Sequence, residues 1–223
     1  MEKWSLPEGW TWRKIEEVCK VNPRRPSLEI SEEVPTSFVP MAAVDEDKGA
    51  ITAMEIKPYR EVMRGYTYFE EEDVLFAKIT PSMENGKAAI ARGLIDGLGF
   101  GSTEFHRLRP KEDVIPEWIY FFVRQKKFRR EAAMHFRGSV GQQRVPKGFL
   151  AHHLIPVAPL NGQRRIVARI EGLFAELGAA RRLHAALVHD EERLMDAALM
   201  EAFEKRETWQ THKLGELVTI EAK

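Results

Sequence analysis

The stretch "RGSVGQQRVPKGFLAHHLIPVAPLNGQRRIVARIEGLFAEL", residues 137–177, joins two unlike kinds of sequence. A polar loop rich in Gln and Arg comes first, a short apolar run ends at Pro159, and an amphipathic helix pattern follows. Upstream, short apolar runs alternate with Gly, Pro, Asn and Asp at intervals typical of a sheet with turns. The sequence therefore predicts a sheet-containing part up to Pro159 and a long helix after it.

The composition is that of a chain that can bury a sizeable core, because 223 residues suffice for one large domain. Its 34 basic and 34 acidic residues cancel, so any contact with nucleic acid must be local. No stretch resembles a signal peptide or approaches the roughly 18 apolar residues of a membrane span, so a cytoplasmic location without membrane partners is expected. Cys19 is the single cysteine, which excludes an internal disulfide and predicts a buried apolar side chain.

Residues 1–159 are predicted to form one mixed α/β (α+β) domain with a strand-rich core. Strands are expected within residues 36–44, 50–56, 66–79, 87–93, 102–110 and 154–157. Helical spacing over residues 115–136 places Trp118, Phe121, Phe122, Gln125 and Phe128 behind Pro116. The run "GLGFGS" at residues 97–102 lacks the spacing of a dinucleotide-binding loop and is predicted to be a turn.

Residues 160–205 are predicted to form a long amphipathic helix of the coiled-coil type, serving dimerisation and spacing. Its apolar stripe comprises Ile166, Ile170, Leu173, Leu177, Leu187 and Leu194. Roughly forty helical residues span on the order of 60 Å, so a second helix should lie along the stripe. The alternative is two shorter helices that break at Gly178 and fold back on each other.

The last segment, residues 206–223, is similar to the beginning of the chain. Trp209, Lys213, Leu214, Glu216 and Val218 correspond to Trp10, Lys14, Ile15, Glu17 and, with one residue of slip, Val18. This similarity predicts that a second repeat begins here and is truncated after its opening residues.

Motifs for catalysis are absent from the sequence. There is no phosphate-binding G-x-x-x-x-G-K-[ST] loop, and "NPRRP" at residues 22–26 lacks the aromatic that amino-methyltransferases place after Asn-Pro-Pro. A turn separates Asp73 from Lys87, unlike the close spacing of a metal nuclease, and the seven histidines are scattered. The sequence predicts neither an enzyme nor a metal site.

Polar and basic residues gather in two predicted loops. One loop contains Lys78, Thr80, Ser82, Asn85 and Lys87, and the other contains Arg137, Ser139, Gln142, Gln143, Arg144 and Lys147. Arg and Lys pair with guanine or phosphate, and Gln and Asn make two hydrogen bonds to adenine. The two loops are therefore candidate DNA-reading elements, although ordinary solvated loops have the same composition.

In its order of motifs the chain resembles the specificity subunits of type I restriction-modification systems. "LPEGWTWRKIEEVC" is similar to their opening, "EDVLFAKITPSMENGKAAI" to a family strand and turn, and "GSVGQQRVPKGFLAHHLIPVAPLNGQRRIVARIEGLFAEL" to the end of a target-recognition domain. "LMDAALMEAF" before "ETWQTHKLGEL" looks like a family helix end that leads into a further domain.

The resemblance implies a non-catalytic DNA-binding subunit that reads one half of a split double-stranded target. Long antiparallel helices would fix the gap and dock methyltransferase subunits, which carry S-adenosylmethionine and bring in restriction subunits. Family subunits usually have two recognition domains, so this chain is expected to be a half-subunit that acts as a homodimer. The alternatives are an interaction module without DNA specificity and a self-sufficient enzyme acting on DNA.

Overall fold

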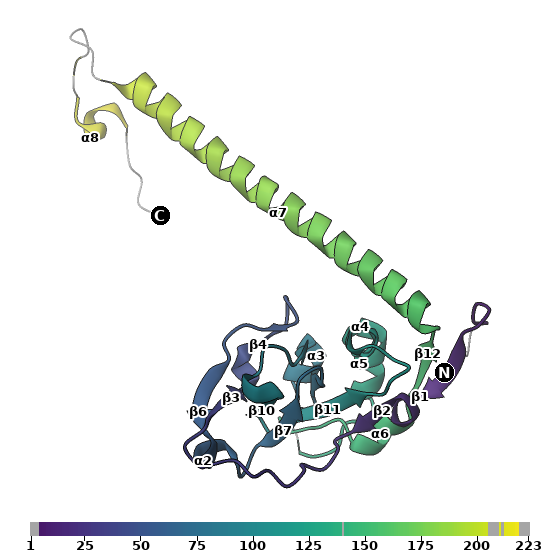
Figure 1. The fold of residues 1–223 in the computed structure, drawn as a ribbon. Helices are drawn as coiled ribbons and strands as arrows, with labels where there is room; N and C mark the ends of the chain where they lie inside the picture. The colour runs from purple at the N-terminus through teal and green to yellow at the C-terminus, as the bar shows by residue number, and fades with distance from the viewer. Residues whose placement is uncertain (1–4, 140, 205–209, 211, 219–223) are drawn as a thin grey trace. The chain divides into compact units, whose positions relative to one another are not determined.

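The computed structural model describes residues 5–139, 141–204, 210 and 212–218 (Figure 1). These residues form two compact units, one ending at Arg169 and one beginning at Ile170. None of the helices within the described ranges has the length and apolar character that spanning a membrane requires.

One four-stranded sheet has the order β6-β3-β10-β7. Its strands are β6 (Glu55–Pro58), β3 (Pro35–Val39), β10 (Leu98–Gly101) and β7 (Thr67–Glu70). β10 runs parallel to β3 and antiparallel to β7. The predicted turn at residues 97–102 was therefore wrong. Gly99 and Gly101 are strand residues whose missing Cβ atoms make room for the ring of Phe69.

The second four-stranded sheet is antiparallel and has the order β2-β11-β8-β9. Its strands are β2 (Cys19–Val21), β11 (Phe105–Pro110), β8 (Val74–Ala77) and β9 (Ala88–Ile90). Every residue of β8 is buried, which explains its continuous apolar sequence. The side chain of Cys19 is 1% exposed, and burial raises the pKa of its thiol to about 12.

Shorter elements complete this unit. Strand β1 (Thr11–Lys14) pairs antiparallel with β12 (Leu154–Val157), so the beginning of the chain lies against the strand that precedes the long helix. A two-stranded ribbon consists of β4 (Val44–Asp45) and β5 (Ala50–Ile51). The single-turn helices are α1 (Ile15–Val18), α2 (Tyr59–Val62), α3 (Ser82–Asn85), η1 (Met41–Ala43) and η2 (Ile95–Gly97).

The predicted helix over residues 115–136 is two helices. α4 (Pro116–Arg124) and α5 (Lys126–Ala133) are separated by Gln125, whose ψ of 132° is extended. The break lets Val123 and Phe128 both enter the main apolar core, which α6 (Lys147–His152) also covers. Gln125 itself is exposed, so its helical spacing with the aromatic residues was misleading.

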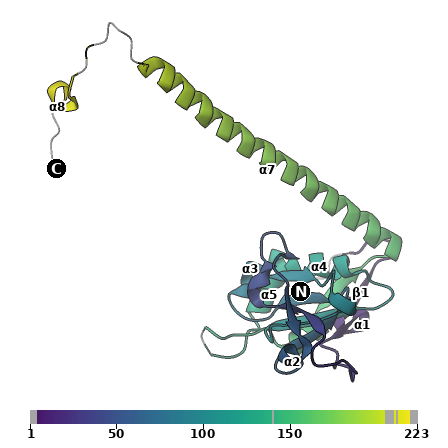
Figure 2. The same ribbon diagram turned by 60° about the vertical axis from the view of Figure 1, so that its left-hand side comes forward.

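α7 (Leu160–Phe203) is one helix of 44 residues, without a break at Gly178 (Figure 1, Figure 2). Its first turns are anchored by the fully buried side chain of Gln163. The amide nitrogen of Gln163 donates to the carbonyl oxygens of Asp113 (2.9 Å) and Ala158 (2.8 Å), and its oxygen accepts from the backbone N–H of Ile115 (3.0 Å). One side chain thus joins the helix start to β12 and to the approach to α4.

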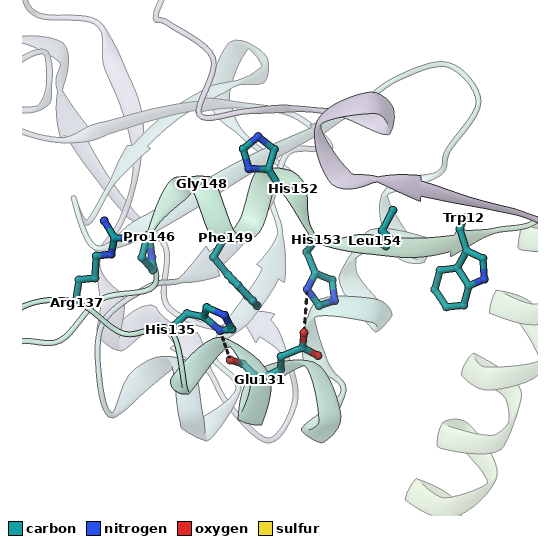
Figure 3. A pocket seen from close by; sticks show the side chains of 10 residues that line it. All are labelled: Trp12, Glu131, His135, Arg137, Pro146, Gly148, Phe149, His152, His153 and Leu154. Carbon is teal, nitrogen blue, oxygen red and sulfur yellow. Dashed lines mark hydrogen bonds and ion pairs between the residues drawn. The ribbon is translucent and has the colours of Figure 1, made fainter. Parts of the chain in front are cut away.

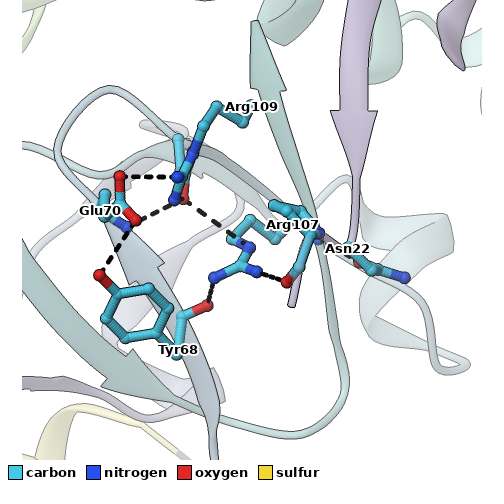
Figure 4. A network of polar contacts seen from close by, with 7 residues as sticks. Asn22, Tyr68, Glu70, Arg107 and Arg109 are labelled. Atoms are coloured by element: carbon cyan, nitrogen blue, oxygen red, sulfur yellow. Dashed lines mark hydrogen bonds and ion pairs between the residues drawn. The ribbon is translucent and has the colours of Figure 1, made fainter. Parts of the chain in front are cut away.

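A buried polar network joins the two large sheets (Figure 4). The Asp73 carboxylate is fully buried and accepts two hydrogen bonds from Arg109, at 2.8 and 2.9 Å. Arg107, which is 3% exposed, donates to the carbonyl oxygens of Tyr68 on β7 and of Pro23. Arg107 itself belongs to β11 of the second sheet, so its guanidinium links one sheet to the other.

The imidazole of His106 forms a second internal connection. Asn22 accepts the backbone N–H of Arg107 through Oδ1, so its amide nitrogen faces Nδ1 of His106 at 2.9 Å. The opposite ring nitrogen, Nε2, donates to the carbonyl oxygen of Val145 at 2.8 Å. These contacts require the neutral ring, and burial lowers the pKa of His106 to about 4.

The segments around α1 and α8 (Leu214–Leu217) adopt the same local structure. In each, a lysine with extended backbone precedes one helical turn, and a glutamate three residues later accepts its backbone N–H. The glutamates are Glu17 and Glu216. Trp209 lies outside the described residues, so its correspondence with Trp10 and the truncated second repeat over residues 206–223 stay predictions.

Replacing Gln163 by Leu should destabilise the protein by about 2–4 kcal/mol, because one buried acceptor, at Ala158, and two part-buried groups, the N–H of Ile115 and the carbonyl of Asp113, lose their partners. Urea unfolding followed by circular dichroism measures the change. Gln125→Leu is the matched control, since that glutamine is exposed, and it should change the unfolding free energy by less than about 0.5 kcal/mol. Equal effects of the two substitutions would contradict the anchoring role.

Acidification should destabilise the folded protein through His106. Its pKa is lowered on folding, so the unfolded chain binds the proton more readily, and stability is lost as pH falls from about 6.5 towards 4. Between pH 7.5 and 5, this single group should cost about 2 kcal/mol. His106→Gln, which does not titrate, should reduce the pH dependence by that amount in urea unfolding. An unchanged pH dependence would contradict the assignment.

Candidate functional site

The two predicted loops lie side by side and form one surface. The backbone N–H of Thr80 donates to the carbonyl oxygen of Gln143 (3.0 Å), and that of Val145 donates to the carbonyl oxygen of Lys78 (2.8 Å). Ile79 and Arg144 form an isolated antiparallel bridge between these bonds. Residues more than sixty positions apart in the sequence are therefore neighbours in one site.

The first loop follows β8 and contains the single turn of α3. Gly86 ends this turn with a φ of 90°, a conformation that glycine adopts without strain. Three predicted residues of this loop have internal partners. Thr80 donates its hydroxyl to Glu84, Asn85 donates to Glu46 (3.4 Å), and Lys87 lies 3.7 Å from the same carboxylate. The other two predicted residues, Lys78 and Ser82, are half-buried.

The second loop is a hairpin-like turn closed by two backbone hydrogen bonds between Arg137 and Arg144, at 3.0 and 2.9 Å. Gly138 has a φ of 113°, and a Cβ there would lie 2.9 Å from the carbonyl oxygen of Gln142, so the turn requires glycine. Among the described residues of its tip, Ser139 and Gln142 are exposed. Val140 lies outside the described residues.

The guanidinium of Arg144 holds the second loop in place. Nε and Nη2 each donate to the carboxylate of Glu104 at 2.8 Å, and Nη1 donates to the carbonyl oxygen of Gln142 at 2.8 Å. This pairing lowers the pKa of Glu104 and raises that of Arg144. All three guanidinium nitrogens contact the protein, so the structure gives Arg144 a positioning role; its predicted DNA contact stays a prediction.

The remaining predicted residues lie at the accessible side of this surface. Arg137 and Lys147 are exposed, and Gln143 is half-buried with its backbone carbonyl bonded to Thr80. Lys147 begins α6, directly after the second loop. The arrangement leaves amide, hydroxyl and cationic groups available together, which is the combination that reads base edges and contacts phosphates.

A hollow of about 610 Å³ lies beside the second loop (Figure 3). Its lining includes Trp12, Glu131, His135, Phe149 and His153. The ring of His135 stacks on Phe149 with centroids 4.5 Å apart, and Nδ1 of His153 lies 3.8 Å from the Glu131 carboxylate. Burial lowers the pKa of His153. Despite its three histidines, no group of three His, Cys, Asp or Glu among the described residues could hold a metal ion.

A second hollow, of about 370 Å³, adjoins the first loop at Lys78. Its lining includes Arg25, Tyr66 and Arg107, none of which was predicted from the sequence as a site residue. The sequence contained one signal for this hollow, the two adjacent arginines of "NPRRP", a motif for which the sequence offered no other role.

The predicted stripe of α7 is exposed through most of its length. Ile166 and Ile170 are half-buried, whereas Leu173, Leu177, Leu187 and Leu194 are 46%, 45%, 67% and 71% exposed. Other large apolar side chains on this helix also face solvent, and the predicted stripe omitted them: Phe174, Leu183, Val188, Met195, Leu199, Met200 and Phe203. The apolar surface is therefore wider than the spacing of three and four residues indicated.

Curated relatives of this chain are subunits of restriction enzymes from Escherichia coli. The specificity subunit of the type I restriction enzyme EcoAI is 36% identical over 171 residues, covering 76% of this chain and 29% of that protein. The EcoEI specificity subunit is 37% identical over 173 residues, covering 77% of this chain and 28% of that protein. The matched part is thus less than a third of each relative's length.

Solved structures show the same fold. The crystal structure of the HsdS subunit from Thermoanaerobacter tengcongensis matches 93% of this chain and 52% of its own, with 26% identity and a TM-score of 0.70. A structure reported for complex assembly and conformational transition of the type I R-M system matches 96% of this chain and 54% of its own, with 27% identity and a TM-score of 0.72.

The family model of the type I restriction modification DNA specificity domain matches residues 7–185, which cover both loops and the first half of α7. This range is most of the chain, and the relatives above agree with it. The chain therefore belongs to the family of type I restriction-modification DNA specificity domains.

Proposed function

We propose that this chain recognises DNA sequence within a type I restriction-modification complex and has no catalytic activity of its own. It reads one half of a bipartite double-stranded target. It docks methyltransferase subunits, which bind S-adenosylmethionine, and through them restriction subunits. The observation that supports this proposal most directly is the union of the two loops into one polar surface within the range that matches the family model.

The chemistry of the loop surface favours reading of base edges over general attraction to a polyanion. Gln142 and Gln143 are consecutive at the turn, and Arg144 fixes the turn through Glu104. Cationic groups on both loops, Lys78, Arg137 and Lys147, supply phosphate contacts around these amides. A preformed loop loses less conformational entropy on binding than a flexible one.

The second part of the proposal is that two copies of this chain pair through α7. Exposed apolar side chains extend along the helix beyond Arg169, and such a surface is seldom left in water. Apolar positions three and four residues apart suit packing against another helix. A second copy supplies a helix of the same length and the same spacing.

The charges on α7 favour an antiparallel pair. Residues 160–182 carry five arginines and two glutamates, a net charge of +3, whereas residues 183–203 carry one arginine and five acidic residues, a net charge of −4. A parallel pair would place like charges together, and an antiparallel pair places each basic half beside an acidic half. The pair would then present two recognition surfaces to an inverted-repeat target with a fixed gap.

Selection of bound sites from random duplex DNA tests the proposed function. The full chain is mixed with a type I methyltransferase subunit, and the bound duplexes are sequenced. A split motif with a constant gap is the expected result, and its two halves should be inverted repeats if two copies pair. A folded protein that enriches no sequence would favour an interaction module, which the exposed apolar surface of α7 would also serve.

Within the loop surface, Gln143→Ala should relax base preference at one target position by roughly 1–3 kcal/mol, because a two-bond contact is lost. Lys147→Ala should weaken all sequences alike and reduce the salt slope by about one, since a phosphate contact is lost. Competition binding with single-base target variants at several salt concentrations separates the two effects. If both substitutions weakened every sequence equally, the base-reading role of Gln143 would be wrong.

Charge reversal tests the antiparallel pair. Asp190→Lys, Glu191→Lys and Glu192→Lys together change the second half of α7 from −4 to +2, since each substitution adds two charges. Light scattering should then find a monomer at micromolar concentration, where the unaltered protein is a dimer. Adding Arg169→Glu, Arg181→Glu and Arg182→Glu changes the first half from +3 to −3 and should restore the dimer. A monomeric unaltered protein would refute the pairing.

A further inference from the structure

The hollow of about 370 Å³ beside the first loop has a lining suited to an anion. Four parts of the chain form it: Asn22, Pro23 and Arg25; Met63, Tyr66, Thr67 and Tyr68; Lys78 of the first loop; and Thr103, Phe105 and Arg107. Three of these residues are cationic, and none of the lining residues is acidic. Its volume lies in the lower part of the range for small-molecule sites, roughly 300–1,000 Å³.

The walls of this hollow are held by the buried network described above. Arg107 donates to the carbonyl oxygens of Tyr68 and Pro23, so it ties two of the lining segments together (Figure 4). The backbone N–H of Arg107 donates to Oδ1 of Asn22 at 2.8 Å, and Asn22 adopts a positive φ of 48°. The charge of Arg107 is balanced by Asp73 at 3.8 Å. The hollow is thus preformed. Arg107 adds little net positive charge to it, because Asp73 lies beside its guanidinium, so the positive charge that could attract an anion comes from the other two cations.

Arg25 and Lys78 supply that charge. The guanidinium of Arg25 is exposed and donates to a neutral partner, the carbonyl oxygen of Met63. Lys78 is half-buried, and within the described residues neither cation forms a direct ion pair with a carboxylate. Lys78 helps to lower the pKa of the nearby Glu104, but that carboxylate is already paired with Arg144. Arg and Lys in such a setting bind phosphate, Arg with a two-pronged geometry and Lys as a point charge.

Tyr66 offers an aromatic surface beside these cations. Its side chain is 44% exposed and meets Phe38 edge to face, with ring centroids 4.8 Å apart. Aromatic rings beside cationic grooves hold single-stranded nucleic acid by stacking on its bases. In a duplex the bases are stacked on one another, so the part of a nucleotide that Tyr66 can contact is the sugar. Lys78 belongs both to this hollow and to the first loop, so the hollow continues the loop surface.

We propose that this hollow binds one phosphate-bearing nucleotide of DNA. The phosphate contacts Arg25 and Lys78, and the attached sugar lies against Tyr66. The inference rests on the proposed function, and it gives "NPRRP" at residues 22–26 a role as a wall of the nucleotide site. A free nucleotide has the same chemistry, so the experiment separates the two sources.

The first measurement compares two adjacent arginines of equal charge. Arg25 lines the hollow, whereas Arg24 is also exposed but does not line it. Binding of the full chain to a fluorescent duplex is followed by anisotropy at several salt concentrations. Arg25→Gln should weaken binding about tenfold and reduce the salt slope by about one. Arg24→Gln should change binding by less than about twofold, and circular dichroism confirms that both variants are folded. Equal losses for both variants would overturn the proposal.

The second measurement locates the phosphate. Duplexes with a single neutral methylphosphonate at successive positions should reveal one position whose neutralisation weakens the unaltered protein but not Arg25→Gln. Tyr66→Ala should weaken binding with little change in the salt slope. If no position distinguishes the two proteins, DNA does not occupy the hollow, and the proposal is overturned.

Thymidine 5′-monophosphate provides the control for a free nucleotide. If it binds the unaltered protein at micromolar concentration and Arg25→Gln abolishes that binding, while no methylphosphonate position responds, the occupant is a free nucleotide and the DNA assignment is overturned. If the unaltered protein binds no duplex even at low salt, the proposed function fails, whereas duplex binding that is unaffected by Arg25→Gln refutes only the nucleotide site.

Discussion

The buried carboxylate of Asp73 is the constraint on which the compact unit that ends at Arg169 depends. A fully buried charge is costly unless it is paired and hydrogen-bonded, and Asp73 meets both conditions through Arg109 and the backbone N–H of Glu70. The guanidinium of Arg107 lies 3.8 Å from this carboxylate. Two of its three nitrogens donate to the carbonyl oxygens of Tyr68 on β7 and of Pro23 after β2. The same cluster joins the two sheets and contributes Arg107, Tyr68 and Pro23 to the wall of the hollow beside them.

A rigid scaffold with polar loops at its strand ends is a common way to build a binding surface. Here the second loop is held from three directions. Its backbone pairs with the first loop, Arg144 pairs with Glu104 before β11, and Val145 accepts a hydrogen bond from His106. The groups that would meet DNA therefore sit on a loop whose position is set by buried or half-buried partners.

Much of the local structure could be predicted from the sequence, and the failures have physical reasons. Strand β12 and the helix after Pro159 could be predicted, because the spacing of apolar residues and the position of proline depend on local structure alone. The break at Gln125 was missed because one extended residue barely disturbs the spacing of the aromatic residues around it. "GLGFGS" was read as a turn, whereas glycines are required there by the ring of Phe69 in the neighbouring strand. The roles of Arg144 and Arg25 depend on partners 40 and 38 residues away, which no local pattern reveals.

The lone cysteine gives this fold a chemical reporter. Thiol reagents attack the thiolate, and the raised pKa of Cys19 together with its burial in β2 suppresses that form in the folded protein. β2 is an edge strand paired with β11, so the thiol becomes reactive only when this sheet edge opens. The rate of alkylation thus records, without any engineered label, how often the scaffold behind the loops comes apart.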